Sequence, residues 1–447
     1  MIKNRLLAAA VTAAILLPTA AMATNGMFMM GNGTKSSGRG GVGIAIADSA
    51  VSGADNPAAM VRVGNRVDFG LQVFRPDRTA TISGNNHPQA PAPGFFDYNG
   101  NGNNDGRFYI PEGGFNYMLS DDMSVGLAVV GTGGMNTSYD NFAMFDGAAM
   151  FAGNVPSTTG INLEVVRILP TLSYMINDKH SIGASLQVVY QQFKAWGLSS
   201  FEASGGPMTG QVSQAPNKLS GKGRDDAWGF GLSLGWQGQL TDKLTVGVVY
   251  NSEVDMDEMD DYSGLLAEDG SLDMPENYGI GLAFQATDQL LLAFDVQQIN
   301  YGDVKSMANP LQSGPGNSGM NMFNPANYLG TKNGSGFGWD DMTVYKLGTE
   351  YMVNDQLTLR AGYSHSDMPI SKDQTFFNIL APAVIEDHIS VGMTYILPHG
   401  SEFSMFYMHA FEEKLKGSNS IPGAFGGGEA DIKMSQDAFG FAYGWNF

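Results

Sequence analysis

One short pattern in this chain could support nucleophilic catalysis. Residues 231–235 read Gly-Leu-Ser-Leu-Gly, which matches the motif that holds a catalytic serine on a sharp turn between a strand and a helix. Here the motif lies inside an alternating apolar segment, so Ser233 and the leucines beside it would point to opposite faces of a strand. No combination of histidine and acid completes a catalytic set with this serine. We therefore predict that the protein is not an enzyme.

Other polar patterns could bind nucleotides or metals. The glycines of residues 38–43 fit a dinucleotide fingerprint, but no strand precedes them as that mechanism requires. Asp97 begins a calcium-like loop whose twelfth position is Phe108 instead of a bidentate glutamate. Six carboxylates in residues 253–261 suit either a solvated loop or divalent cations that bridge to lipopolysaccharide. Because the six histidines have no ligand spacing, we predict no cofactor and no resident metal.

The C-terminal segment indicates which kind of element carries these residues. Phe439, Phe441, Tyr443, Trp445 and Phe447 alternate with small or polar residues. Successive side chains of a strand point to opposite faces, so this segment has one fully aromatic face. Such a face is typical of a transmembrane β-barrel strand with its aromatic side chains toward lipid. The final Phe447 resembles the terminal aromatic residue that outer-membrane proteins present to their assembly machinery, which we expect as a partner.

The N-terminus has the features of a secretory signal peptide. Lys3 and Arg5 precede an apolar run over residues 6–17 and small residues at 21–23, so residues 1–23 are predicted to be removed. Removing these two cations changes the formal net charge from -20 to -22, which argues against binding nucleic acid through bulk charge. The chain has no cysteine, which excludes disulfides and a thiol nucleophile. After residue 23 no uncharged apolar run reaches about 18 residues, so spanning helices are excluded.

Alternating segments and turn residues predict the size of the barrel. Glycine-rich residues 24–64 show no alternation, which begins at Val67. Six short turns are predicted at residues 120–122, 177–180, 241–243, 287–289, 354–356 and 398–400. Seven long connections alternate with them, at about 76–106, 132–160, 194–225, 253–274, 301–340, 367–384 and 412–434. We therefore predict an all-β fold, a transmembrane antiparallel 14-stranded β-barrel over residues 65–447, with both termini in the periplasm.

The start of the predicted mature chain is similar to a known family. The Thr-Asn-Gly of residues 24–26, the Gly-Thr-Lys-Ser of residues 33–36 with the glycines of residues 38–43, and Asn56, Pro57 and Ala58 resemble the N-terminal hatch of the FadL family. These are Gram-negative outer-membrane transporters of long-chain fatty acids, with relatives that import aromatic hydrocarbons. The resemblance implies that residues 24–64 form a hatch, or plug, in the barrel lumen, with Asn56, Pro57 and Ala58 as its motif.

Apolar residues beside the predicted hatch and in the long loops indicate a hydrophobic ligand. Methionine and phenylalanine adapt to flexible apolar ligands. Apolar clusters exposed on loops mark binding sites, although such loops can also pack on one another. The candidate ligand-binding residues are Met27, Phe28, Met29, Met30, Phe142 and Phe145, and further apolar loop residues lie at 150–151 and 320–323.

Three cations could receive a ligand carboxylate. The predicted turn at residues 354–356 places Glu350 opposite Arg360 on the lumen face, with Lys346 nearby. One interpretation is a structural ion pair. The other is a carboxylate site formed by Lys346, Arg360 or Arg167.

A lateral exit is implied by the same resemblance. In the FadL family a kink in the third strand opens the barrel wall, so that ligand passes sideways into the membrane. Here the third strand is predicted as the short stretch of residues 123–131, and Pro170 lies within the fourth. Proline cannot donate to a sheet ladder, so Pro170 must interrupt strand pairing, either as a bulge that adjusts curvature or as part of the gap. The candidate gap residues are Gly126, Gly131 and Pro170.

These observations predict an outer-membrane transporter for hydrophobic compounds. We expect a monomer that binds long-chain fatty acids in an apolar lumen site and releases them through the barrel wall. An importer of aromatic hydrocarbons, a general aqueous porin and an outer-membrane lipase or protease are the alternatives. Outer-membrane lipid and lipopolysaccharide are expected partners, and nucleic acid is not.

Overall fold

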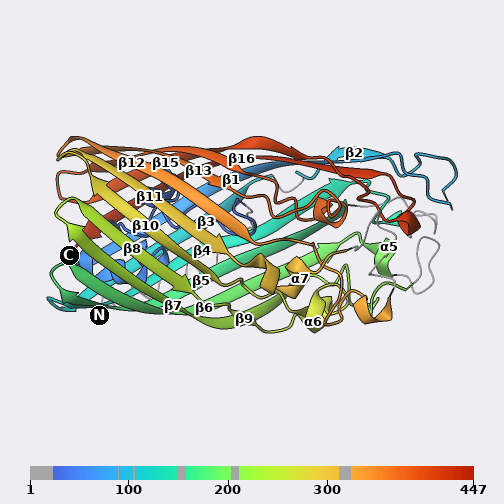
Figure 1. The fold of residues 1–447 in the computed structure, drawn as a ribbon, viewed down its shortest axis with the longest axis horizontal. Helices are drawn as coiled ribbons and strands as arrows, with labels where there is room; N and C mark the ends of the chain where they lie inside the picture. The colour runs from blue at the N-terminus through green and yellow to red at the C-terminus, as the bar shows by residue number, and fades with distance from the viewer. Residues whose placement is uncertain (1–23, 89, 104–105, 148–157, 203–210, 312–323) are drawn as a thin grey trace.

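The computed structural model describes residues 24–88, 90–103, 106–147, 158–202, 211–311 and 324–447. Within these residues, fourteen antiparallel strands form one closed barrel (Figure 1). They are β1 (Arg66–Ser83), β3 (Phe108–Ser120), β4 (Met123–Asp140), β5 (Thr158–Asn177), β6 (His180–Trp196), β7 (Asp225–Thr241), β8 (Leu244–Asn251), β10 (Asn277–Gln285), β11 (Leu290–Ile299), β12 (Met342–Asn354), β13 (Leu357–Ser366), β14 (Asp387–Ile396), β15 (Glu402–Leu415) and β16 (Glu429–Asn446). Pairing of β1 with β16 closes the ring, so the predicted barrel is confirmed. The predicted signal peptide, residues 1–23, lies outside the described residues.

Side chains alternate between the outer face of the barrel and its lumen. On β7, Leu232 and Leu234 are each 44% exposed, whereas Ser233 between them is 3% exposed. Phe439, Phe441 and Tyr443 of β16 are exposed in the same way, with Ala438 and Ala442 buried, and Trp445 is half-buried. This is the period of two that a strand imposes. The Gly-Leu-Ser-Leu-Gly pattern is therefore in the middle of a strand and not on a sharp turn.

The two ends of the barrel differ. Each of the six predicted short turns joins the pair of strands expected of it, and these turns lie at the end where the C-terminus emerges (Figure 1). The long connections extend the opposite end, which we call the loop end. They contain β2 (Tyr98–Asn101), β9 (Asp255–Met256), α5 (Ser199–Glu202), η3 (Asp260–Tyr262), α6 (Ala267–Gly270), η4 (Tyr301–Asp303), α7 (Lys305–Ala308), η7 (Pro325–Asn327), η8 (Phe377–Ile379) and η9 (Gly423–Phe425). Among the helices in the described residues, none is long and apolar enough to cross a membrane.

The third strand of the barrel is longer than predicted. β4 continues through the glycines after residue 131 and ends at Asp140, so the prediction of a short strand over residues 123–131 is wrong. A register shift between Gly131 and Gly133 marks a β-bulge against β5, which bends the strand without ending it. Pairing with β3 stops at the pair Glu112 and Val130, and beyond it the described residues of these two strands are not paired.

The fourth strand has the predicted interruption at proline. Ile168 pairs with Val188 and Thr171 pairs with Ser185, but among the described residues Leu169 and Pro170 have no partner on β6. The register on both sides is the same, so the strand does not slip. Pairing of Pro170 with β4 continues through Leu127. The predicted break at Pro170 is confirmed, and it faces β6.

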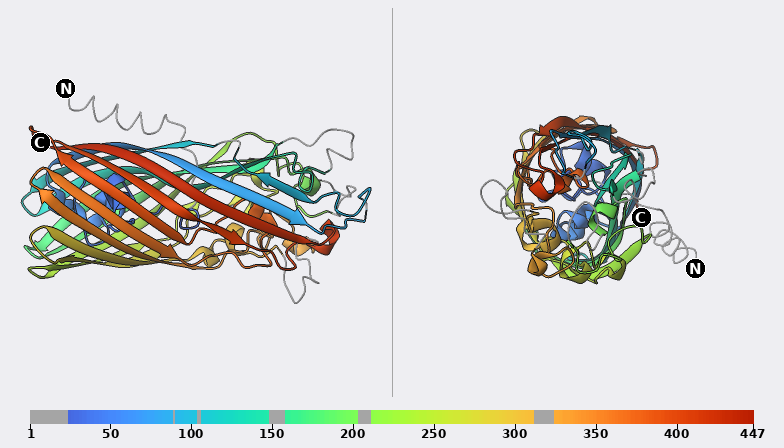
Figure 2. Two further views of the ribbon diagram at one scale, coloured as in Figure 1. Left: turned by 90° about the horizontal axis from the view of Figure 1, so that it is seen from above. Right: turned by 90° about the vertical axis from the view of Figure 1, so that its right-hand side faces the viewer.

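Residues 24–64, which we call the lumen segment, run inside the ring of strands. Viewed along the barrel axis, the segment is enclosed by the ring of strands (Figure 2). It contains α2 (Thr34–Gly38), η1 (Ser52–Ala54), η2 (Pro57–Ala59) and α3 (Met60–Val63), separated by irregular backbone. Glycines in the barrel wall allow the lumen segment to approach the strands closely. A Cβ at Gly235 would lie 2.9 Å from Pro57 Cδ, and one at Gly348 would lie 2.5 Å from the Arg39 carbonyl oxygen. The segment therefore packs directly against the wall.

Aromatic residues from several long connections form a core at the loop end. Phe145 contacts Phe142, Phe201 and Phe376, with ring centroids 4.8, 5.2 and 5.0 Å apart. Phe142 and Phe145 are both fully buried, so the expectation that they are exposed on the loops is wrong. They are buried because separate connections pack on one another, which was the alternative interpretation. The apolar residues at 150–151 and 320–323 lie outside the described residues.

Candidate functional site

Carboxylates on the barrel wall accept hydrogen bonds from the backbone of the lumen segment. Asp68 on β1 accepts from Ala50 N at 2.7 Å, and Glu112 on β3 accepts from Thr34 N at 3.0 Å. Asp295 on β11 accepts from the backbone nitrogens of residues 43 and 44 at 2.8 and 3.1 Å. Buried N–H groups of irregular backbone have no partner in a helix or sheet, so they need such acceptors. Asp68 and Glu112 supply them from the neighbouring strands β1 and β3, and Asp295 supplies them from β11.

A buried network of ion pairs holds the same segment. Arg39 Nη1 donates to Asp48 Oδ2 at 2.6 Å and also to Glu350 on β12. Glu350 in turn accepts from Arg360 Nε at 2.7 Å, and Arg360 Nη1 donates to Thr394 at 2.6 Å. Burial raises the pKa of Asp48, but the nearby charges of Arg39 and Lys35 outweigh it and hold that pKa well below its usual range. Arg360 is therefore part of a structural network, as one of the two interpretations supposed.

A second ion-pair group lies beside the first strand. Lys35 Nζ and Arg66 Nη2 both donate to Glu402 Oε2, each at 2.6 Å, and Arg66 Nε donates to Asp68 at 2.8 Å. Lys35 also donates to the Asp48 carbonyl oxygen at 2.7 Å. Breaking a buried pair by removing one partner costs about 3–5 kcal/mol, because the remaining charge is left uncompensated. Both groups therefore resist displacement of the lumen segment.

The Asn-Pro-Ala motif forms a turn near the end of the lumen segment that leads into β1. Asn56 Oδ1 accepts from Ala58 N at 3.0 Å and so caps η2, with Pro57 at its first position. Asn56 Nδ2 donates to the carbonyl oxygens of Ile44 and Trp236 at 2.8 and 3.1 Å, and the Ala58 carbonyl accepts from Ser181 at 3.0 Å. The motif therefore joins the segment to β6 and β7 as well as capping it.

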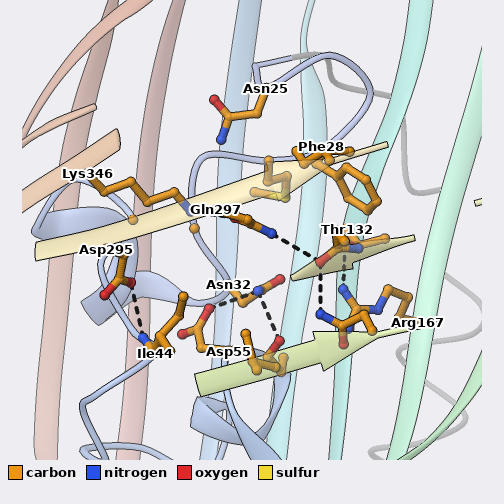
Figure 3. A pocket seen from close by; sticks show the side chains of 18 residues that line it. Asn25, Phe28, Asn32, Ile44, Asp55, Thr132, Arg167, Asp295, Gln297 and Lys346 are labelled. Carbon is orange, nitrogen blue, oxygen red and sulfur yellow. Dashed lines mark hydrogen bonds between the residues drawn. The ribbon is translucent and has the colours of Figure 1, made fainter. Parts of the chain in front are cut away.

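Above this part of the lumen segment lies a cavity of about 40 Å³, which we call the lumen cavity. That volume suits about three water molecules or one carboxylate group. Among the described residues, its charged lining consists of two cations and two acids: Arg167 on β5, Lys346 on β12, Asp295 on β11 and Asp55 in the lumen segment (Figure 3). A smaller cavity of about 10 Å³ shares Phe28, Arg167 and Asn277 with the lumen cavity.

Arg167 is the least satisfied charge in this cavity. Its side chain is 6% exposed, and its Nη1 donates a long hydrogen bond of 3.4 Å to Thr132 Oγ1. Within the part of the chain that the structure describes, Nε and Nη2 have no hydrogen-bond partner. Buried guanidinium N–H groups without hydrogen-bond acceptors cost several kcal/mol. Arg167 is therefore suited to receive an anionic group.

Lys346 lies on the other side of the same cavity (Figure 3). It is directly opposite Asp295 in the β11–β12 register, and its Nζ donates to Gln297 Oε1 at 3.3 Å. Asp55 accepts from Asn32 Nδ2 at 2.9 Å. Burial raises the pKa of Asp55 to about 6, against the opposing effects of the Asn32 hydrogen bond and the Lys346 charge. The structure thus places Arg167 and Lys346 in the lining of one cavity. Arg360 lies outside this cavity, in the ion-pair network with Glu350.

The start of the lumen segment covers the cavity. Phe28 and Met29 line it, whereas Met27 and Met30 are buried in the surrounding core. Met29 N donates to Thr132 O at 3.0 Å, at the bulge of β4. On the other side, Tyr301 Oη donates to Asn25 O at 2.7 Å and accepts from Met27 N at 2.9 Å. This first turn is therefore held between β4 and a loop-end tyrosine.

The three candidate gap residues lie in different surroundings. A Cβ at Gly131 would lie 2.5 Å from Ile110 Cγ2, where pairing of β3 with β4 has already ended. Gly126 lies in the fully paired part of β4, and a Cβ there would meet Met60 of the lumen segment at 2.7 Å. Pro170 is one strand further along. The end of β3–β4 pairing therefore lies beside Gly131 and not beside Gly126.

Three residues of the site were not among the sequence predictions: Asp55, Asp295 and Tyr301. Asp295 has a visible signal, because it is an acid at a lumen-facing position of β11 between Ala293 and Gln297. Asp55 and Tyr301 have none, since their roles depend on contacts between distant parts of the chain. Among the described residues, no three histidine or acidic side chains are grouped as a metal site would need.

A closed barrel with an apolar outer face and its own N-terminal segment in the lumen defines the class of outer-membrane β-barrel transport proteins. The model of the family described as "Outer membrane protein transport protein (OMPP1/FadL/TodX)" matches residues 10–447. The chain belongs to this family of outer-membrane transporters for hydrophobic compounds.

Curated relatives agree with the family. A long-chain fatty acid transport protein of Escherichia coli is 22% identical over 377 residues, which are 76% of each chain. A 47 kDa outer membrane protein of Pasteurella multocida is 24% identical over 376 residues, 78% of each chain.

Solved structures share the fold. A FadL homologue of Pseudomonas aeruginosa superposes with a TM-score of 0.66 at 17% identity, over 94% of this chain and 100% of that one. The toluene transporter TodX of P. putida gives 0.64 at 20% identity, over 94% and 99%. At these identities the likeness concerns the fold.

Proposed function

We propose that this protein takes up long-chain fatty acids, binds their carboxylate in the lumen cavity and releases them through the barrel wall. The observation that carries the proposal is Arg167, a buried cation with two nitrogens unpartnered within the described residues, beside Lys346 in the same cavity. A toluene-like hydrocarbon would leave these two nitrogens without a hydrogen-bond acceptor. A carboxylate would accept its hydrogen bonds and offset its burial.

The apolar chain of the ligand supplies most of the affinity. Burial gains about 0.8 kcal/mol per methylene, on the order of 10 kcal/mol for a sixteen-carbon chain. The lumen cavity accommodates the headgroup but not such a chain, so Phe28 and Met29 must move when ligand binds. Moving Phe28 joins the two cavities that it lines. The flexible methionine and phenylalanine side chains at residues 27–30 then contact the chain.

In this proposal the lumen segment is the hatch of the barrel, with Asn56, Pro57 and Ala58 at its base. Its network of ion pairs supports a static base. The first turn is held differently, by hydrogen bonds of Tyr301 and Thr132. The ligand therefore displaces residues 25–30 while the base of the hatch remains in place.

The exit in this proposal lies between β3 and β4. Their pairing ends at Glu112 and Val130, and the side chain of Ile110 fills the space beside Gly131. An apolar side chain across an unpaired stretch of wall is displaced at smaller cost than a ladder of backbone hydrogen bonds. The break at Pro170 loosens the neighbouring strand and supports the bend.

Ligand binding to the full-length mature protein in lipid nanodiscs tests the proposal. We expect oleate to bind more tightly than toluene. Arg167→Gln and Lys346→Met should each weaken oleate about tenfold to a hundredfold, the equivalent of a lost charge-assisted hydrogen bond of about 1.5–3 kcal/mol. Neither variant should change the affinity for toluene. Lys218→Gln is the matched control, because it removes an exposed cation 3.8 Å from Asp260.

Two results would contradict the proposal. One is oleate affinity that survives the double variant in a folded barrel. The other is toluene binding more tightly than oleate in the unaltered protein, which would favour an importer of aromatic hydrocarbons.

A further inference from the structure

The lumen cavity is electrically balanced before any ligand enters. Arg167 and Lys346 contribute two positive charges, and Asp55 and Asp295 contribute two negative charges when ionised. Arg39 and Glu112 also act on Asp55, but each has a partner of its own, Glu350 for Arg39 and the Thr34 backbone for Glu112. A monoanionic headgroup would therefore leave one uncompensated negative charge in a buried space. Such a charge is costly unless a proton neutralises it.

Of the two acids, Asp55 is better placed to take this proton. Asp295 accepts two backbone hydrogen bonds, from residues 43 and 44, which favour its ionised form. Asp55 accepts a single side-chain hydrogen bond, from the Asn32 amide. Its carboxyl already has a pKa raised to about 6 by burial, close to neutral pH. A new anion in the cavity would raise that pKa further.

We propose that an anionic headgroup enters the lumen cavity together with one proton from solvent, which binds the carboxylate of Asp55. This inference rests on the headgroup site proposed above. The balance is simple: one anion and one proton enter, no covalent bond to carbon changes, and the cavity stays neutral. On release to a membrane or to an aqueous phase, the anion and the proton leave together. Transport through this site therefore moves a carboxylate and a proton, the equivalent of the neutral acid.

Thermodynamic linkage predicts how the dissociation constant of the ligand changes with pH. When one proton is taken up with each ligand, the dissociation constant rises about tenfold for each unit of pH. The slope appears above the pKa of Asp55 in the empty site, from about pH 6 upward, and it ends at the higher pKa of the liganded site. Below about pH 6 the proton is already bound, and affinity is constant.

A long-chain alkyl sulfonate is the probe, because its headgroup stays anionic over this whole range. Binding is measured on the full-length mature protein in lipid nanodiscs between about pH 6 and pH 8, with the alcohol of the same chain length as an uncharged control. We expect a tenfold slope for the sulfonate and none for the alcohol. Calorimetry in two buffers of different ionisation enthalpy should show nearly one proton taken up per sulfonate. Asp55→Asn should abolish both the slope and the uptake.

A second variant covers the case in which Asp55→Asn does not fold. Asn32→Leu removes the hydrogen bond that favours ionised Asp55, so the sloping range should begin at a higher pH. A sulfonate affinity independent of pH in the unaltered protein would overturn the proposal, as would a slope that persists in folded Asp55→Asn. If instead the sulfonate binds no better than the alcohol and Arg167→Gln changes nothing, the anionic headgroup site itself fails, and both proposals with it.

Discussion

Glu350 on β12 and Arg360 on β13 face each other across their hairpin, with Arg360 Nε 2.7 Å from Glu350 Oε1. The same carboxylate accepts from Arg39 of the lumen segment. Glu350 thus links the wall to the segment inside it, because one anion is shared by a wall cation and a segment cation. The relationship connects barrel stability to closure of the lumen.

Replacing Glu350 tests this link. Glu350→Gln keeps the size of the side chain but leaves both arginines with less compensation, at a cost of about 3–5 kcal/mol to docking of the segment. We expect ion conductance across planar bilayers to rise, with frequent openings. Asp260→Asn is the matched control, since it removes a 93% exposed acid. A variant as silent as the unaltered protein would show that this network does not keep the lumen closed.

The hydroxyl group of Tyr301 holds the first turn of the segment. Tyr301→Phe leaves Met27 N buried without its partner, at a cost of about 1–3 kcal/mol, and leaves Asn25 O with only the hydrogen bond from Phe28 N. We expect the amide of Met27 to exchange hydrogen about tenfold to a hundredfold faster, and ligand to bind faster. Tyr407→Phe is the control, because its hydroxyl donates to Asp437 on the outer face. Equal exchange in the two variants would mean that Tyr301 does not hold this turn.

Filling the space between β3 and β4 should block release without preventing binding. Gly131→Val places atoms where Ile110 lies, so we expect transfer of a fluorescent fatty acid from the lumen into vesicles to slow at least several-fold, with the dissociation constant unchanged. Gly423→Val is the control, since no other heavy atom lies within 4 Å of a Cβ there. Gly126→Val should act differently and disturb the lumen segment through Met60. Normal release by a folded Gly131→Val protein would argue for an exit elsewhere.

Removing the lumen segment should open the barrel. Deletion of residues 25–60 takes away the side chains and backbone that fill the ring, and we expect a folded barrel with large conductance in planar bilayers. Heat-dependent mobility on gels verifies that the barrel is folded. A folded deletion variant without conductance would show that the described loop core closes the lumen by itself.

The sequence predicts those parts of the fold that depend on local pattern. Alternation of side chains and the turn residues give fourteen strands, because both signals lie within a few residues of one another. The length of β4 is missed, since the glycines after residue 131 resemble a strand end, whereas the structure uses them in a bulge. Burial of Phe142 and Phe145 is missed for another reason, because it depends on how distant loops cover one another.

In the candidate site, too, residues on regular strands are predictable from the sequence, whereas a residue placed by contacts between distant parts of the chain is not. Arg167 and Lys346 are predictable as lumen-facing cations on regular strands. Asp55 is not, because its place beside them depends on where an irregular segment without period settles inside the barrel. Its neighbours come from β5, β11 and β12, which are far apart along the chain.

The lumen segment also touches both sides of the seam at which the ring closes. Ala50 bonds to Asp68 on β1, and Lys35 bonds to Glu402 on β15, the strand next to β16. Pairing of β1 with β16 joins the two ends of the chain, and contacts so distant in sequence form slowly because loop closure costs entropy. A segment that precedes β1 in the chain and bonds to both β1 and β15 would hold the two sides of the seam near each other before they pair. We therefore expect the deletion variant to refold more slowly, with the lumen segment acting during assembly as a template for the wall that later encloses it.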